Sequence, residues 1–178
     1  MRLKRHHFVL AIVLLVIAGL LIGALWTHPI TRYRTQRAAS RFYSSLITGD
    51  YARAFDNLAY YDRYSDLAPE ISHAAAKTIW IERVDALREA QIYLVDMEGL
   101  EVHFDDGYPV GTARVVVMDR GEVITAVQRI HFVERAGVWK VQTVSTDQDQ
   151  GVVAIARINK AISGLVKPLA DASPEAIP

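Results

Sequence analysis

Residues 92–146 read IYLVDMEGLEVHFDDGYPVGTARVVVMDRGEVITAVQRIHFVERAGVWKVQTVST, and three short polar turns divide this stretch into segments. The turns are Asp105-Asp106-Gly107, Asp119-Arg120-Gly121 and Glu134-Arg135-Ala136-Gly137. Glycine late in a short polar loop supplies the positive φ that a tight hairpin requires. The segments between the turns are roughly ten residues long and rich in β-branched and aromatic residues, which suit strands. The stretch therefore predicts an antiparallel meander of four strands.

Valines occur at both alternating sets of positions in this meander, so both faces of the predicted sheet are apolar. One face is needed to pack against helices, and the other is too rich in valine to be left in water. The residues assigned to this outer, interface-forming face are Val115, Val117, Val123, Val127 and Val133. This pattern favours association with a protein partner or with a second copy of the chain.

The net charge of zero hides a division along the chain. The first 41 residues carry seven basic residues and no acidic one, which leaves a net charge of −7 on the remainder. A basic stem on an acidic body is typical of a membrane-tethered domain, because lipid phosphates attract only the stem. The acidic body argues against nucleic-acid binding. The absence of cysteine excludes disulfides and thiolate metal sites.

Residues 8–26 read FVLAIVLLVIAGLLIGALW and contain no charged side chain. At about 1.5 Å per residue, this run matches the thickness of the hydrocarbon core of a bilayer. It is longer than the apolar region of a signal peptide, and no Ala-x-Ala cleavage motif follows it directly. We therefore predict a lipid-embedded, uncleaved single-pass anchor at residues 8–27, between a basic cytoplasmic tail (1–7) and a juxtamembrane stem (28–37).

The orientation of this anchor rests on the short basic tail directly before the apolar run, which is the usual arrangement of a signal anchor. It places the amino terminus in the cytoplasm and the following domain outside the cytoplasmic membrane. The arginines at positions 32, 34, 37 and 41 count against this orientation, because they put positive charge on the other side as well.

Three helical segments are predicted between the anchor and the meander. Pro29 either ends the membrane helix or begins a new one, and helical apolar spacing from Ala38 to Ile47 allows one helix to run on from the stem. Gly49 ends this helix and Asp50 caps the next, which is followed by a cluster of tyrosines. Pro69 begins a third helix that extends to about Glu89. Helices followed by a meander are the pattern of an α+β fold.

Two motifs carry a resemblance to a known family. Residues 42–55, FYSSLITGDYARAF, resemble the opening helix pair of nuclear-transport-factor-2-like (cystatin-like cone) domains. Residues 137–141, GVWKV, resemble the strand that closes the sheet in that family. The resemblance covers about residues 38–146 and implies a curved sheet wrapped around a long helix, which leaves a conical cavity. The family includes isomerases, dehydratases, transport factors and membrane-anchored subunits of secretion and conjugation channels, so fold does not choose the function.

The resemblance supplies candidate residues for the cone. The aromatic candidates for its lining are Phe42, Phe55, Trp80, Tyr93 and Trp139. The polar candidates are Tyr60, Tyr61, Asp62 and Asp96. Family enzymes pair an aspartate base with tyrosine or aspartic-acid donors, which requires a carboxyl group in an apolar pocket beside a donor. Here the tyrosines follow a helix, where their rings commonly pack, and Asp96 lies near Gly99, which indicates a bulge.

We therefore expect no catalytic site and no cofactor. We also expect no metal site, because the histidines do not form a ligand pair at any usual spacing.

Residues 147–168 predict a C-terminal amphipathic helix, and residues 169–178 a disordered tail. The apolar side of this helix needs a cover, for which there are three options: the outer face of the sheet, a partner subunit and the membrane interface. Packing within a protein is favoured over contact with the membrane.

Two functions follow from these patterns. The first is a membrane-anchored, non-catalytic domain outside the cytoplasmic membrane that acts in protein interaction or in assembly of an envelope complex. The alternative is a cone that binds a small apolar ligand, with or without isomerase-like or dehydratase-like chemistry. An open cavity with a convergent carboxylate and hydroxyl would favour the alternative, and a cone filled by Phe42, Phe55 and Trp80 would disfavour it.

Overall fold

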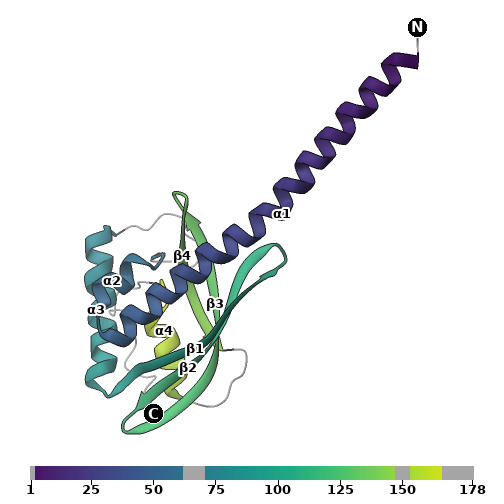
Figure 1. Ribbon diagram of the computed structural model, residues 1–178. Helices are drawn as coiled ribbons and strands as arrows, with labels where there is room; N and C mark the ends of the chain where they lie inside the picture. The colour runs from purple at the N-terminus through teal and green to yellow at the C-terminus, as the bar shows by residue number, and fades with distance from the viewer. Residues whose placement is uncertain (1–2, 62–70, 147–152, 166–178) are drawn as a thin grey trace. The chain divides into compact units, whose positions relative to one another are not determined.

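A computed structural model describes residues 3–61, 71–146 and 153–165 (Figure 1). It shows an α+β fold in which helices pack on a four-stranded antiparallel sheet. The chain divides into two compact units, Met1–Arg34 and Thr35–Pro178. Residues 147–152 and 166–168 of the predicted C-terminal amphipathic helix, and the predicted disordered tail at 169–178, lie outside the described residues.

The first helix, α1, spans Leu3–Thr48 and contains Pro29 within it. The continuous helix that the sequence allowed is therefore the observed one, and neither Pro29 nor the predicted stem interrupts it. In the second unit α1 buries Ala39, Phe42 and Tyr43 against the rest of the domain. It ends at Gly49, whose φ of +78° is the left-handed conformation that closes helices.

The side chains of α1 are described from His28 onward, together with Val13 and Leu15. A search of the described residues finds no helix that is long and apolar enough to cross a membrane. Most of the predicted anchor at residues 8–27 lies outside the side chains described, so the anchor stays a prediction.

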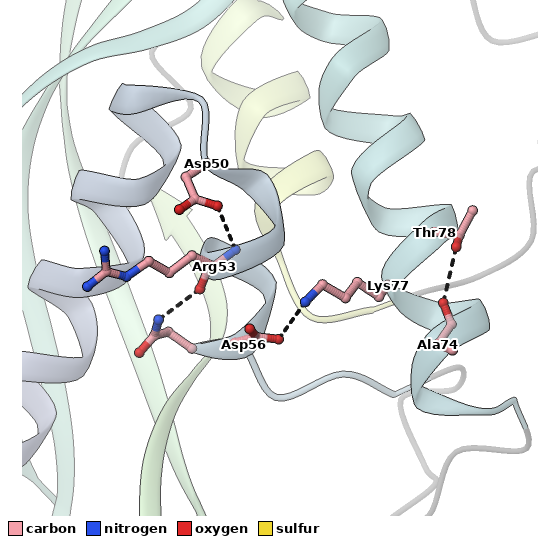
Figure 2. Close-up of polar contacts among 7 residues, drawn as sticks. Asp50, Arg53, Asp56, Ala74, Lys77 and Thr78 are labelled. Carbon is pink, nitrogen blue, oxygen red and sulfur yellow. Dashed lines mark hydrogen bonds and ion pairs between the residues drawn. The ribbon is translucent and has the colours of Figure 1, made fainter.

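Local capping marks the starts of the next two helices. Helix α2 spans Tyr51–Asp56, and the backbone N–H of Arg53 donates to the Asp50 carboxylate at 3.1 Å, so Asp50 is the predicted N-cap (Figure 2). Helix α3 spans His73–Glu89 and is capped by Ser72, so it begins after Pro69, the predicted first residue.

A surface ion pair joins the two helices: the ammonium of Lys77 on α3 lies 2.8 Å from the carboxylate of Asp56 on α2 (Figure 2).

The meander consists of β1 (Ile92–Asp105), β2 (Tyr108–Asp119), β3 (Glu122–Arg135) and β4 (Val138–Thr146), hydrogen-bonded in that order. The three predicted turns are confirmed, and each is a two-residue loop. Both loop residues have positive φ in every case, +48° and +84° at Asp106-Gly107 for example, which is the type I′ geometry. Because the loops are this short, the first three strands exceed the expected ten residues.

Register shifts mark bulges in the sheet. Strand β1 shifts against β2 between Leu94 and Asp96, and again between Glu98 and Glu101, where Gly99 has a φ of +61°. The bulge predicted near Asp96 and Gly99 is therefore present. A third shift lies where β4 passes His131 and Phe132 of β3. Bulges increase the local twist and bend the strand that carries them.

The last helix, α4 (Val153–Ile162), packs against β4 and α3. Its Ile155, Ile158 and Ile162 join the same core as Val115 and Val117 of β2. Two expectations are thereby corrected. The outer face of the sheet is not the cover for this helix, and Val115 and Val117 lie on the inner, helix-covered face with no exposed surface.

Candidate functional site

The inner face of the sheet, where the resemblance implied a cavity, is filled by aromatic side chains and by α4. Phe42, Phe55 and Trp80 have no exposed surface and pack ring against ring. The ring centroids are 6.4 Å apart for Phe42 and Trp80 and 5.7 Å apart for Phe55 and Trp80. These three candidate lining residues are therefore core residues, as in the filled cone that the sequence analysis considered.

The other two candidate lining residues are half-buried. The ring of Tyr93 lies beneath the guanidinium of Arg88, whose central carbon is 5.4 Å from the ring centroid. Tyr93 also borders an apolar hollow of about 20 Å³ at the junction of the helices with β1. Such a volume holds about one water molecule. Trp139 of β4 packs at the edge of the core.

The polar candidates for the cone lie in different surroundings. The Tyr60 ring packs against Phe55 and His73, with centroids 5.8 and 5.4 Å away. Tyr61 is buried and forms a backbone bridge to Leu165. Asp62 lies outside the described residues.

Asp96, offered as a polar cone group, is instead exposed. Its carboxylate accepts a hydrogen bond from the backbone N–H of Met97 at 2.8 Å. This correction follows from the bulge, which turns residue 96 to the outer side of the strand.

A buried polar network that the sequence analysis missed joins α1, β3 and α4. The hydroxyl of Tyr43 donates to Oε1 of Gln128 at 2.6 Å, and Nε2 of Gln128 donates to Oδ1 of Asn159 at 2.6 Å. Burial raises the pKa of the Tyr43 hydroxyl far above its usual range, so it remains a hydrogen-bond donor. The one available signal was Gln128 itself, a polar residue at an inward position between Ala126 and Ile130.

Residues 163–165, directly after α4, form hydrogen bonds to β4, to α3 and to Tyr61. The N–H of Gly164 donates to Gln142 O of β4 at 2.8 Å, and the N–H of Tyr61 donates to Gly164 O at 2.9 Å. The guanidinium of Arg83 on α3 donates to the carbonyls of Ser163 and Leu165, at 2.9 and 2.5 Å.

Burial lowers the pKa of Arg83 to about 10, and the nearby Tyr61 opposes this shift. The hydrogen bonds from Arg83 to the end of α4 therefore form at the cost of partly removing its charge from water.

The outer face of the sheet carries the exposed apolar surface. Val123 and Val127 of β3 expose 64% and 55% of their surface, and Val133 is half-buried. Val116 and Met118 of β2, both half-buried, lie on the same face, since Met118 pairs with Val123. Exposed Arg114 pairs with Val127 across the two strands. Of the five valines predicted for this face, three therefore lie on it.

The histidines and carboxylates of the described residues gather in no group of three or more that could hold a metal ion. His73 packs edge-on against the aromatic rings of Phe55 and Tyr60 at the start of α3.

Comparison with protein-family models gives no match, and comparison with curated proteins gives none either. Among solved structures, a chain from Catenulispora acidiphila is similar to this one. It shares 15% sequence identity, covers 72% of this chain and 99% of its own length, and superposes with a TM-score of 0.47.

Proposed function

We propose that this protein is a non-catalytic, membrane-tethered domain that binds another protein through the outer face of its sheet. The observation that carries the proposal is the apolar strip on β2 and β3, formed by Val116, Met118, Val123, Val127 and Val133. The helices share their core with the opposite face, and α4, which was one candidate cover for the outer face, is buried there too. The strip is therefore left open to a partner.

The size of this face suits a protein interface. Four strands about 4.8 Å apart and about 12 residues long present a surface on the order of 700 Å². A stable interface of standard size buries about 800 Å² on each partner. Arg114 and Thr125 interrupt the valines, a mixture typical of interfaces whose partners also exist apart.

The filled inner face counts against the alternative of a cone that binds a small apolar ligand. Such a site requires several hundred Å³ of cavity. Here α4 and the Phe42, Phe55 and Trp80 cluster occupy the space in question, and the hollow beside Tyr93 is about 20 Å³.

The anchor and its topology belong to the same proposal. Residues 8–27 hold the protein in the cytoplasmic membrane, with the amino terminus in the cytoplasm and the domain outside it. The supporting observation is the uncharged run at residues 8–26 behind a basic tail. Protease treatment of intact cells tests the topology, because an extracytoplasmic domain is degraded and a cytoplasmic one is protected.

We further propose that residues 38–146 form a nuclear-transport-factor-2-like domain. The two motifs that carry the resemblance occupy structural positions that fit it. Gly49 and Asp50 form the break between α1 and α2, and residues 138–141 open the last strand of the sheet.

Two single-cysteine variants test the interaction face, because the chain has no cysteine of its own. Val123 exposes 64% of its surface on the outer face, and Val153 exposes 63% at the start of α4. With a thiol-to-amine crosslinker in native membranes, Val123→Cys is expected to yield a protein adduct and Val153→Cys is not. Equal yields from the two positions would remove the proposed face.

A substitution at the centre of the strip gives a second test. Val127→Glu places a carboxylate beside Arg114, its cross-strand partner, so the folded monomer tolerates it. The same charge is expected to suppress the adduct from Val123→Cys by about tenfold or more, because burying a charge in an interface is costly. Light scattering after size-exclusion chromatography then tells whether the partner is a second copy.

A further inference from the structure

The solvent side of α1 carries a second surface that the sheet interaction does not use. Arg37, Arg41 and Ser44 are all exposed and follow one another at steps of four and three residues, which places them on one side of the helix. We call this surface the arginine face. Within the part of the chain that the structure describes, neither arginine side chain forms an ion pair or a hydrogen bond.

We infer that the arginine face docks the Thr35–Pro178 unit on anionic lipid headgroups. This inference rests on the proposed membrane tether, and it names a lipid surface as a partner of the folded domain as well as of the anchor.

The direction of the arginine face follows from the contacts on the other sides of α1. Gln36 donates from Nε2 to the carbonyl of Leu100 on β1 at 3.2 Å, so this side of the helix faces the sheet. Phe42 and Tyr43 are buried in the core. At about 100° per residue, Arg37 and Arg41 lie about 100° and 140° around the helix from Gln36. The arginine face therefore points away from the sheet.

The distribution of charge favours the arginine face as the part of the domain that meets an anionic surface. No acidic residue occurs before Asp50, whereas the chain after residue 41 carries a net charge of −7. Exposed acidic residues lie on β1, at Asp96, Glu98 and Glu101. An anionic surface therefore attracts the arginine face of α1 and repels the acidic residues of β1.

Chain length favours a lipid surface over a nucleic acid or an acidic protein as the source of this negative charge. The apolar run ends at residue 26, and Arg37 follows only eleven residues later in the chain. A tether this short holds the arginines at a high effective concentration beside the headgroups. Each arginine that reaches an anionic surface contributes about fivefold to the docked population.

Docking in this way has a consequence for the proposed function. The inner face of the sheet is on the α1 side, so a domain that rests on the arginine face turns the valines of the outer face away from the lipid. The membrane would then orient the domain for its protein partner.

A spin label on the full-length chain in nanodiscs tests the inference. The label is attached to Ser44→Cys, within the arginine face, or to Thr125→Cys, an exposed outer-face position. Nickel chelated on lipid headgroups reports collisions with the label. We compare nanodiscs of phosphatidylcholine with nanodiscs of phosphatidylcholine and phosphatidylglycerol at three to one. The Arg37→Gln/Arg41→Gln variant removes the face, and Arg114→Gln/Lys140→Gln is its charge-matched control on the outer face.

The expected result is frequent collision at position 44 in anionic nanodiscs only, with little at position 125. Arg37→Gln/Arg41→Gln lowers the docked population about 25-fold, 1 M salt does the same, and the control pair leaves it unchanged. Equal collision at position 44 in both lipids, absence of collision at position 44 in the anionic nanodiscs, or an equal effect of the control pair overturns the inference.

Failure of the tether is read separately, by resistance of the chain to alkaline extraction from membranes. If the full-length chain is extracted, the proposed anchor is wrong. Co-sedimentation of that chain with vesicles of the same two compositions then gives the answer on the arginine face, with the same variants and the same expected differences.

Discussion

Gly164 is the position where one added methyl group should cost most, because two backbone segments close on it. A Cβ built on Gly164 would lie 1.8 Å from the carbonyl oxygen of Ala59 and 2.8 Å from that of Gln142. Neither oxygen belongs to a flexible side chain that could turn away. In Gly164→Ala the segment after α4 must therefore move by more than about 1 Å to restore ordinary van der Waals contact.

Two backbone hydrogen bonds depend on this close approach. The N–H of Gly164 donates to Gln142 O at 2.8 Å, and Gly164 O accepts from the N–H of Tyr61 at 2.9 Å. A buried backbone group left without its partner costs about 1–3 kcal/mol. The gain from restricting the unfolded chain is about 0.4–1 kcal/mol, which offsets little. We expect Gly164→Ala to lower the free energy of unfolding by about 3–5 kcal/mol.

The measurement is thermal unfolding of the full-length chain in detergent, followed by far-UV circular dichroism, together with hydrogen exchange of α4. For a domain of this size the expected fall in Tm is about 10 °C. Amides of α4 should exchange faster, because the segment that holds its end has been displaced.

The control is Gly99→Ala in β1. Gly99 has a φ of +61°, but an added Cβ there meets no atom within 4 Å. Its expected cost is about 1 kcal/mol, from the left-handed backbone alone. If Gly164→Ala cost no more than Gly99→Ala, the close approach would not be the reason for glycine, and the account of how α4 is held would be wrong.

Substitutions at three further positions test the buried contacts and the cap. Tyr43→Phe leaves Oε1 of Gln128 without its donor, so we expect a loss of about 1–3 kcal/mol in urea unfolding, and no loss would mean that another group satisfies the amide. Arg83→Met removes two hydrogen bonds to the carbonyls after α4 but also a buried charge, so a net loss of about 1–3 kcal/mol is expected, with faster hydrogen exchange in α4. Asp50→Ala should cost about 1 kcal/mol and Asp50→Ser much less, because serine can still accept from the first turn of α2; equal losses in thermal unfolding would argue against the cap.

The features that the sequence determined by itself are local ones. Each hairpin turn requires positive φ at two neighbouring residues, and glycine at the second position makes the turn visible in the chain. The Gly49-Asp50 break and the bulge near Gly99 are also set by residues within a few positions of each other. The anchor at residues 8–27 stays a prediction, and it too rests on a local feature, the uncharged run at residues 8–26.

Only the tertiary structure decided which valines are inside. Val115, Val116 and Val117 are consecutive, so alternation along β2 fits either face, and a shift of one residue exchanges them. Pairing with β3 settles the matter, because Val115 lies opposite buried Ala126 and Val116 opposite exposed Thr125. The place of α4 was equally open, since an amphipathic pattern shows that a helix needs a cover and not which cover. Contacts between distant residues decide it: Asn159 with Gln128, and Gly164 between Ala59 and Gln142.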